Sequence, residues 1–423
     1  MTTTKNNEHK KLNFSSEREQ SQACLNSAEH EKNQGRKVLN VPNLRFPEFQ
    51  GEWEEERLAD IADLYKGTGI SKDQLSDDGE PCILYGELYT KYKSETIREV
   101  ISKTNIDNTK LVRSKANDVI IPCSGETAED IATARCVLNG NILLGGDLNI
   151  IRLHGYDGAF MSYQLNGRRK YDIAKVAQGV SVVHLYGEHM KGVKTINPCL
   201  KEQKKIASLL ALLDERISTQ NKIIDKLQSL IKGIVDCTIL HKEKNAIVGD
   251  VCSISEQIRA EANIDDIITV RLHGNGVCKS SAENLQLGAT QYYRRKAGQL
   301  IYGKQNFHNG AIGIVPISLD NGITSKDIPS FDIDEMKCNS VYLLAQLQSP
   351  QYYKPAEALT TGTGSKRLKE ETFLKMPIVL PNKREQDDIA VLIHRASMNL
   401  DHAKRLLELL SIQKQFLLRQ MFI

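Results

Sequence analysis

The sequence predicts an α/β protein built as an internal duplication: two globular modules, each followed by a long helix, with the two helices paired as an antiparallel coiled coil. Three observations support this prediction. Two halves of the chain resemble each other, a heptad pattern of apolar residues follows each module, and short β-type runs between turn residues fill the modules. The length of 423 residues also suits two large modules better than one core.

The repeat is clearest when Pro198 is aligned with Pro381, an offset of 183 residues. Without a gap, two Glu-Gln pairs and two Ile-Ala pairs then coincide: Glu202-Gln203 with Glu385-Gln386, and Ile206-Ala207 with Ile389-Ala390. Upstream, an offset of 182 aligns three further residues: Gln164, Leu165 and Tyr171 with Gln346, Leu347 and Tyr353. The match therefore extends from the helices back into each module.

A seam with alternating steps of four and three residues follows each proline, as in the a and d positions of a coiled coil. In the first copy the seam consists of Ile206, Leu210, Leu213, Ile217, Gln220, Ile224, Leu227, Ile231 and Ile234. In the second copy it consists of Ile389, Ile393, Ala396, Leu400, Ala403, Leu407, Leu410, Lys414 and Leu417. Each helix should run for roughly 38 residues, and a narrow apolar stripe of this length needs a partner stripe. The alternative is two core helices of separate domains.

Five segments follow from these patterns. They are a polar tail at 1–38, which we expect to be disordered, a first module at 39–200, a long helix at 201–242, a second module at 243–383 and a second long helix at 384–423. Within the first module we expect a helix at Phe160–Asn166. The expected strands there are Cys82–Tyr85, Asp118–Pro122, Asn141–Leu144 and Asn149–Leu153.

Composition restricts the function classes. The net charge is only +3, so nucleic-acid binding would depend on local basic patches. Nine cysteines without a CxxC pair indicate reduced thiols, and no apolar run approaches the roughly 18 residues of a membrane span. We therefore expect a cytoplasmic protein without a membrane contact.

Catalytic signatures fail on inspection. Gly67-Thr-Gly69 lacks the third glycine of a dinucleotide loop, and Gly187–Gly192 has phosphate-loop spacing but Val193 where lysine is required. No residues cluster at metal-ligand spacing. The sequence thus predicts no catalytic residue, no metal site and no bound cofactor, and favours a protein that recognises a partner.

Basic clusters at corresponding places in both copies are the candidate DNA-binding residues, because cations with aromatic neighbours suit phosphates and base edges. The second copy supplies Tyr292, Tyr293, Arg294, Arg295, Lys304, Ser365, Lys366 and Arg367. The first supplies Arg168, Arg169, Lys170 and Ser181, with the Gly179–Leu185 segment as the counterpart of the glycine-rich loop at Gly362–Arg367. A solvated surface is the alternative for each cluster.

The Glu-Gln pairs allow two interpretations. Glu202, Gln203, Glu385 and Gln386 lie near helix starts, where they could cap the helix or contact a partner protein. Asn382 is the expected N-cap residue of the second helix. Lys414, the charged residue in the seam, is expected to extend its ammonium group toward solvent near the helix end.

Taken together, these residues resemble the specificity subunit of type I restriction-modification enzymes. The resemblance is carried by the entry Pro42–Phe49 with Trp53, Leu58 and Asp60-Ile61, and by the twice-repeated block of Pro, Glu-Gln, Ile-Ala and long helix at 198–240 and 381–423. It implies that each module is a target recognition domain that reads one half of a bipartite, asymmetric site in double-stranded DNA. It also implies that the paired helices set the spacing between the halves.

By the same resemblance, two methyltransferase subunits dock on the helices and restriction motor-nuclease subunits join the complex. Adenine N6 methylation with S-adenosylmethionine, and the use of ATP and Mg²⁺, would belong to those subunits, so this chain would be non-catalytic. A coiled-coil adaptor without DNA affinity and a stand-alone enzyme are the rival functions.

Overall fold

The structure is a computed structural model that describes residues 39–107, 109–179, 182–280, 290–362 and 366–423. The expected polar tail at 1–38 lies outside these residues. The chain forms two compact units: unit 1 combines the residues up to Asp214 with Gln413–Ile423, and unit 2 comprises Glu215–Ile412. Each unit contains one globular module, called module 1 or module 2 after its unit, together with a segment of each long helix.

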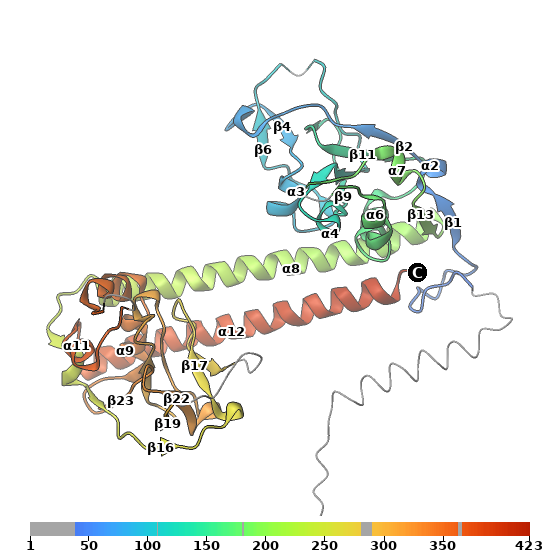
Figure 1. Ribbon diagram of the computed structural model, residues 1–423. Helices are drawn as coiled ribbons and strands as arrows, with labels where there is room; N and C mark the ends of the chain where they lie inside the picture. Colours follow the sequence, from blue (N-terminus) through green and yellow to red (C-terminus); the bar gives the residue numbers. More distant parts are fainter. Residues whose placement is uncertain (1–38, 108, 180–181, 281–289, 363–365) are drawn as a thin grey trace, which may run out of the picture. The chain divides into compact units, whose positions relative to one another are not determined.

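Module 1 is built on a five-stranded sheet in the order β2-β11-β7-β9-β5, shown in blue to green in Figure 1. A second sheet has the order β10-β4-β6-β3, and two further pairs, β1 with β13 and β12 with β8, are antiparallel. The strands are β1 (Glu54–Arg57), β2 (Ala62–Lys66), β3 (Leu75–Ser76), β4 (Glu80–Ile83), β5 (Thr96–Ile97), β6 (Ser102–Thr104), β7 (Asp118–Pro122), β8 (Ser124–Gly125), β9 (Arg135–Val137), β10 (Leu143–Leu144), β11 (Leu148–Leu153), β12 (Val183–His184) and β13 (Lys194–Asn197).

The sequence explains where these strands begin. Asn117 and Asp147 precede β7 and β11 with φ angles of 80° and 59°, a left-handed conformation that Asn and Asp adopt more readily than other non-glycine residues. All five residues of β7 are buried, as expected for the central strand of a covered sheet. The strand expected at Asp118–Pro122 is thereby confirmed.

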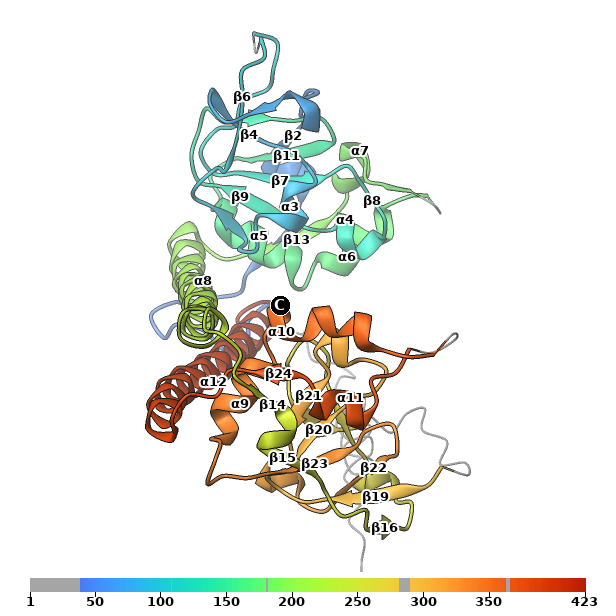
Figure 2. The ribbon, with the colours of Figure 1, turned by 90° about the vertical axis from the view of Figure 1, so that its left-hand side faces the viewer.

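The helices of module 1 are α2 (Leu58–Ile61), α3 (Glu87–Thr90), α4 (Ala128–Ile131), α5 (Gly158–Asn166), α6 (Lys170–Val176) and α7 (Gly187–Met190). α3 packs on the face of the large sheet that carries Ile120, and the other five pack on the opposite face. Helix α5 lies against β7 and β9 (Figure 2). It begins where the Asp157 carboxylate accepts a hydrogen bond from the Phe160 amide, and it buries both Met161 and Tyr163. The expected helix at Phe160–Asn166 is therefore present and begins two residues earlier.

Module 2 has smaller sheets, in the orders β15-β23-β20-β21, β16-β19-β22, β17-β18 and β14-β24. Its strands are β14 (Ala246–Ile247), β15 (Cys252–Ile254), β16 (Arg259–Ala260), β17 (Ile268–Val270), β18 (Val277–Lys279), β19 (Tyr292–Arg295), β20 (Leu300–Tyr302), β21 (Ile312–Ile314), β22 (Gly322–Ser325), β23 (Ser330–Ile333) and β24 (Pro377–Ile378). Its helices are α9 (Ser340–Leu347), α10 (Pro350–Tyr353) and α11 (Glu370–Leu374). An aromatic cluster of Tyr302, Phe307, Phe331 and Phe373 fills its core.

The two long helices are α8 (Leu200–Val235, 36 residues) and α12 (Lys383–Gln420, 38 residues). No residue of either predicted seam is exposed. In unit 1, Ile206 near the start of α8 shares a core with Leu417 near the end of α12. In unit 2, Val235 at the end of α8 shares a core with Ile389 near the start of α12. Of the helices that the structure describes, none has the length and hydrophobicity needed to span a bilayer.

Candidate nucleic-acid interface

A glycine-initiated hairpin recurs in both modules at the predicted offset. Gly179 has a φ of 125° and Gly362 a φ of 124°, and each begins a loop closed by one antiparallel bridge, Gln178 with His184 or Thr361 with Arg367. A side chain at Gly179 would also collide with the Val182 carbonyl oxygen, 2.1 Å from the position of a Cβ atom. The two loops are therefore structural counterparts. Ser181 and Ser365, two of the candidate DNA-binding residues, lie outside the described residues.

The hairpin of module 2 is the centre of its cationic surface. Lys304, Lys366 and Arg367 come together because the Leu368 amide donates to the Lys304 carbonyl oxygen at 2.9 Å. Each cation is paired with a carboxylate: Lys304 with Glu370 at 2.7 Å, Lys366 with Glu357 at 3.0 Å and Arg367 with Asp327 at 3.3 Å. The sequence near these cations contains few acids, but the fold supplies acids from other segments.

The ion pairs leave Lys366 and Arg367 at the surface, whereas the side chain of Lys304 is only 15% exposed. The side chains of Lys366 and Arg367 remain 60% and 47% exposed. The hydrogen bond from Lys366 lowers the pKa of the Glu357 carboxyl. Exposed pairs of this kind contribute little stability, so a phosphate group can replace the carboxylate at low cost.

Strand β19, with the sequence Tyr292-Tyr293-Arg294-Arg295, divides its side chains between surface and interior. Tyr292 and Tyr293 are each only 7% exposed, and Arg295 is fully buried, whereas Arg294 is exposed. Of the four candidates on this strand, Arg294 is therefore the one with an exposed side chain, and a DNA-binding role for these residues stays a prediction.

Arg295 instead organises the sheets of module 2. Its guanidinium donates to the Thr324 hydroxyl at 2.7 Å, the Ser330 hydroxyl at 2.8 Å and the Ile328 carbonyl oxygen at 3.0 Å. Burial lowers the pKa of Arg295 to about 10. These bonds tie β19 to β22 and β23, and they leave the guanidinium no access to a ligand at the surface.

The basic run of module 1 has a structural role in two of its three residues. Arg168 donates to the main-chain oxygen of Arg419 at 2.8 Å, and Arg169 donates to the main-chain oxygen of Ile423 at 3.4 Å. Arg168 therefore binds the last turn of α12 and Arg169 binds Ile423, which follows that helix, while a DNA-binding role for either arginine stays a prediction. Lys170 is half-buried at the start of α6.

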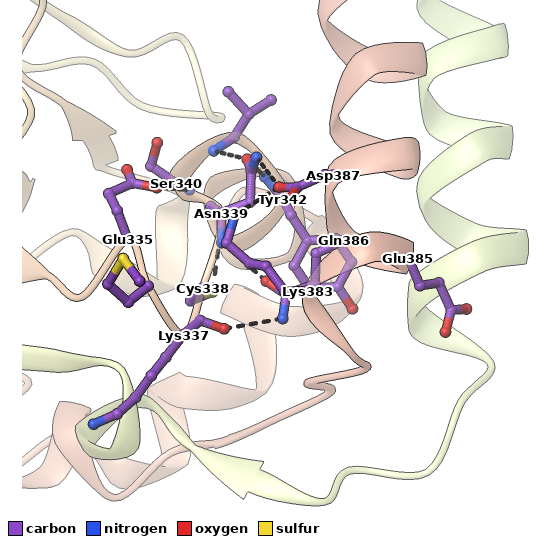
Figure 3. A network of polar contacts seen from close by, with 12 residues as sticks. Glu335, Lys337, Cys338, Asn339, Ser340, Tyr342, Lys383, Glu385, Gln386 and Asp387 are labelled. Atoms are coloured by element: carbon purple, nitrogen blue, oxygen red, sulfur yellow. Dashed lines mark hydrogen bonds and ion pairs between the residues drawn. The ribbon is translucent and has the colours of Figure 1, made fainter.

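The glutamines of the two Glu-Gln pairs make the same contacts in each copy. Gln203 accepts from the Asp157 amide, where α5 begins, and donates to the Pro198 carbonyl oxygen at 2.8 Å. Gln386 accepts from the Asn339 amide, where α9 begins, and donates to the Pro381 carbonyl oxygen at 2.8 Å. Figure 3 shows Gln386 between the first turns of α9 and α12. Both glutamines are buried and tie each long helix to its module.

A second pair of buried glutamines completes this repeated clamp. Gln164 forms two hydrogen bonds with the main chain of Ile196, and Gln346 forms the same two bonds with Val379. Ile196 and Val379 each precede the aligned proline by two residues. Gln164 with Gln203, and Gln346 with Gln386, are called the glutamine clamp of their module below.

The glutamates beside these glutamines differ between the copies. Glu202 is fully buried and binds Arg45 through two hydrogen bonds of 2.7 Å, which raise the pKa of the Arg45 guanidinium. Glu385 pairs with Lys242 and stays exposed, and its side chain points away from Gln386 in Figure 3. Asn382 accepts from the Glu385 amide at 3.0 Å and is the N-cap residue, as predicted. Glu385 is thus the accessible member of the predicted docking residues.

Two functional residues escaped the sequence interpretation. Arg45 gave no signal beyond its place in the Pro42–Phe49 entry. Lys414 was expected to reach solvent, but its side chain is only 16% exposed and its ammonium group lies 2.6 Å from a carboxylate oxygen of both Glu95 and Asp214. Its position in an apolar seam was the signal, because a lysine there needs a buried partner.

Comparison with known proteins shows similarity to one family. Residues 50–229, which include most of module 1 and of α8, match the type I restriction modification DNA specificity domain. The type I restriction enzyme MjaVIII specificity subunit of Methanocaldococcus jannaschii is 22% identical over 378 residues, which cover 82% of this chain and 86% of that protein. The S subunit of a type I restriction-modification system from M. genitalium has a similar fold, with a TM-score of 0.63 at 14% identity over 90% of this chain and 99% of that one.

Proposed function

The chain belongs to the specificity subunits of type I restriction-modification systems, and on this premise we propose that its two modules each read one half of a bipartite, asymmetric site in double-stranded DNA. The observation that carries the proposal is that the two modules share buried contacts but differ in their exposed side chains. The glutamine clamps, the φ of the first hairpin glycine and the bridge that closes the hairpin recur in both modules, yet the described hairpin residues differ in their side chains. Two modules with the same buried contacts and different exposed side chains would be suited to bind two different DNA sequences.

The two long helices, as an antiparallel coiled coil, would set the spacing between the half-sites. Supporting this, the start of α8 meets the end of α12 within unit 1, and the end of α8 meets the start of α12 within unit 2. Between these ends, the Gln220 side chain donates to the Ala403 carbonyl oxygen at 3.1 Å. Each residue adds about 1.5 Å along a helix, so the number of residues in the paired helices would determine the distance between the half-sites.

The outer faces of the helices would dock two methyltransferase subunits. Leu212, Leu409 and Phe416 are 61%, 63% and 56% exposed, although apolar side chains of this size are usually buried. Glu385 adds an accessible charge at the start of α12. Restriction motor-nuclease subunits would join this assembly in the cytoplasm.

The chemistry would belong to the partners. In this proposal the chain is non-catalytic and binds no cofactor, while S-adenosylmethionine, ATP and Mg²⁺ are used by the methyltransferase and restriction subunits. Within module 2, Lys366 and Arg367 would contact phosphates and Arg294 a base edge, because these cations are exposed. In module 1, Lys170 and the hairpin that ends at His184 are the corresponding candidates.

Mapping methylated adenines across the genome, with and without this gene, tests the proposal. We expect one two-part motif with a fixed spacer to lose its methylation when the gene is deleted. An unchanged methylation map, with the methyltransferase subunit expressed, would contradict it. The complex should also bind DNA with strong salt dependence, which a protein adaptor has no reason to show.

A further inference from the structure

One ammonium group ties three distant segments of unit 1 together. The Nζ atom of Lys414, on α12, lies 2.6 Å from Glu95 Oε2, in a loop of module 1, and 2.6 Å from Asp214 Oδ1, on α8. The three side chains are 16%, 11% and 7% exposed. The second carboxylate oxygen of Asp214 accepts from the Tyr163 hydroxyl at 2.7 Å and the Ser94 hydroxyl at 3.0 Å. Every charge in the cluster therefore has a partner.

The end of the same helix is held by further polar contacts. The last carbonyl groups of a helix lack partners within it and carry the negative end of its dipole. Here Arg168 donates to the Arg419 carbonyl oxygen, and the Leu44 amide donates to the Gln420 carbonyl oxygen at 2.9 Å. Module 1 thus contacts α12 both through its Lys414 side chain and through its terminal carbonyls.

The equivalent place in unit 2 has no such charges. At the repeat offsets, Lys414 corresponds to Ile231, Asp214 to Ser397 and Arg168 to Pro350. The described residues at the end of α8 form exposed polar contacts instead, which include the ion pair of Lys242 with Glu385 and a hydrogen bond from Gln351 Nε2 to Asp236 Oδ1 at 3.3 Å. The charged cluster is consequently a property of unit 1 and not of the repeat.

Chain connectivity explains why the charged cluster occurs only in unit 1 of the described residues. Ten residues, 236–245, separate the end of α8 from β14 of module 2, so a short covalent connection keeps this helix end on its module. Lys414 and Glu95 are separated by 319 residues. The entropy cost of closing a loop grows with its length, and contacts alone must offset that cost in unit 1.

We propose that Lys414, Asp214 and Glu95, together with Arg168, form a clasp that fixes the axial position of the end of α12 on module 1. An apolar seam alone tolerates axial slip, whereas the ammonium meets both carboxylates in one register and any slip leaves buried charges unpaired. The inference rests on the proposed function, because the position of this helix end would keep the spacing of the two half-sites constant.

Hydrogen exchange of the full chain tests the clasp directly. Lys414→Met removes the charge at similar length, and Lys404→Met, at an exposed position of the same helix, is the matched control. We expect amides of residues 413–420 to exchange at least tenfold faster in Lys414→Met, with β7 and β11 unchanged. No acceleration, or equal acceleration throughout module 1, would overturn the proposal.

A second variant separates positioning from stability. Lys414→Met combined with Glu95→Gln and Asp214→Asn removes all three charges of the clasp and keeps an acceptor for Tyr163. The nearby buried guanidinium of Arg135 keeps its main-chain acceptors, the carbonyl oxygens of Leu88, Tyr92 and Ala134. This triple variant should fold with a thermal midpoint within a few degrees of the wild type. In the methyltransferase complex it should methylate sites with more than one spacer length. Methylation confined to the original spacer at the original rate would show that the clasp does not position the helix.

The two proposals fail in different ways. If the wild-type complex methylates no bipartite motif, the proposed function is wrong, while the exchange experiment still decides whether the clasp holds α12. If the wild type methylates one motif and the triple variant behaves identically, the function stands and the clasp is refuted.

Discussion

The two hairpins begin and close in the same way but carry different side chains. Each begins at a glycine with a φ near 125°, and in each a single antiparallel bridge joins residues six positions apart, Gln178 with His184 and Thr361 with Arg367. Module 2 places Lys366 and Arg367 on its hairpin, whereas module 1 places Val182, which is 52% exposed, and His184. Inside each module the glutamine clamp is unchanged. Buried contacts have thus been kept while the exposed surface has diverged.

The largest expected effect is a difference in the free energy of unfolding between variants of two neighbouring arginines of module 2. Arg295→Met removes the donor to Thr324, Ser330 and Ile328, so it should lower the free energy of unfolding by about 3 kcal/mol. Arg294→Met, at the exposed neighbour, should change it by less than about 0.5 kcal/mol. Denaturant unfolding of the full chain measures both. Equal losses of stability would show that the buried Arg295 and the exposed Arg294 do not have different roles.

A smaller effect should be the same in both modules. Gln203→Ala and Gln386→Ala each leave a part-buried main-chain amide and a proline carbonyl without this partner, and Gln386→Ala also removes a hydrogen bond to the Lys337 carbonyl oxygen. Each variant should therefore cost about 2 kcal/mol. Hydrogen exchange should locate the loss at α5 in the first variant and at α9 in the second. A large loss in one variant alone would mean that the clamp is not equivalent in the two copies.

The smallest effect concerns the hairpins. Lys366→Ala and Arg367→Ala should each weaken DNA binding by the complex about equally on all sequences, and should lower the salt slope by about 0.9 per lost phosphate contact. His184→Ala, at the equivalent place in module 1, should leave the slope nearly unchanged at neutral pH. Titrations at several salt concentrations measure these slopes. Identical salt slopes for all three variants would show that the two hairpins do not differ in their phosphate contacts.

Local patterns in the sequence predicted the elements that depend on local forces. The long helices, strand β7 and helix α5 follow from heptads, apolar runs and turn residues, and the repeat follows from the alignment of Pro198 with Pro381. Helices and strands of this kind depend mainly on residues close together in the sequence, and the repeat can be found by comparing the sequence with itself.

Contacts between distant segments could not be predicted in this way. Arg168 resembles a surface cation until the end of α12, 251 residues away, supplies its acceptor. Arg367 stands in a segment with few acids, yet Asp327 approaches it from a separate loop. Arg295 lies in a strand whose pairing buries it, and the run of four polar or aromatic residues gave no indication of which side faces inward.

Exchange of one module is the most direct test of the central claim that each module reads its own half of the DNA site. Residues 45–195 would be replaced by the first module of another specificity subunit, with both long helices and module 2 retained, and methylated adenines would be mapped in cells that express the methyltransferase. The account predicts a motif with one half changed, and with the other half and the spacer preserved. A motif in which both halves change, or neither does, would contradict it.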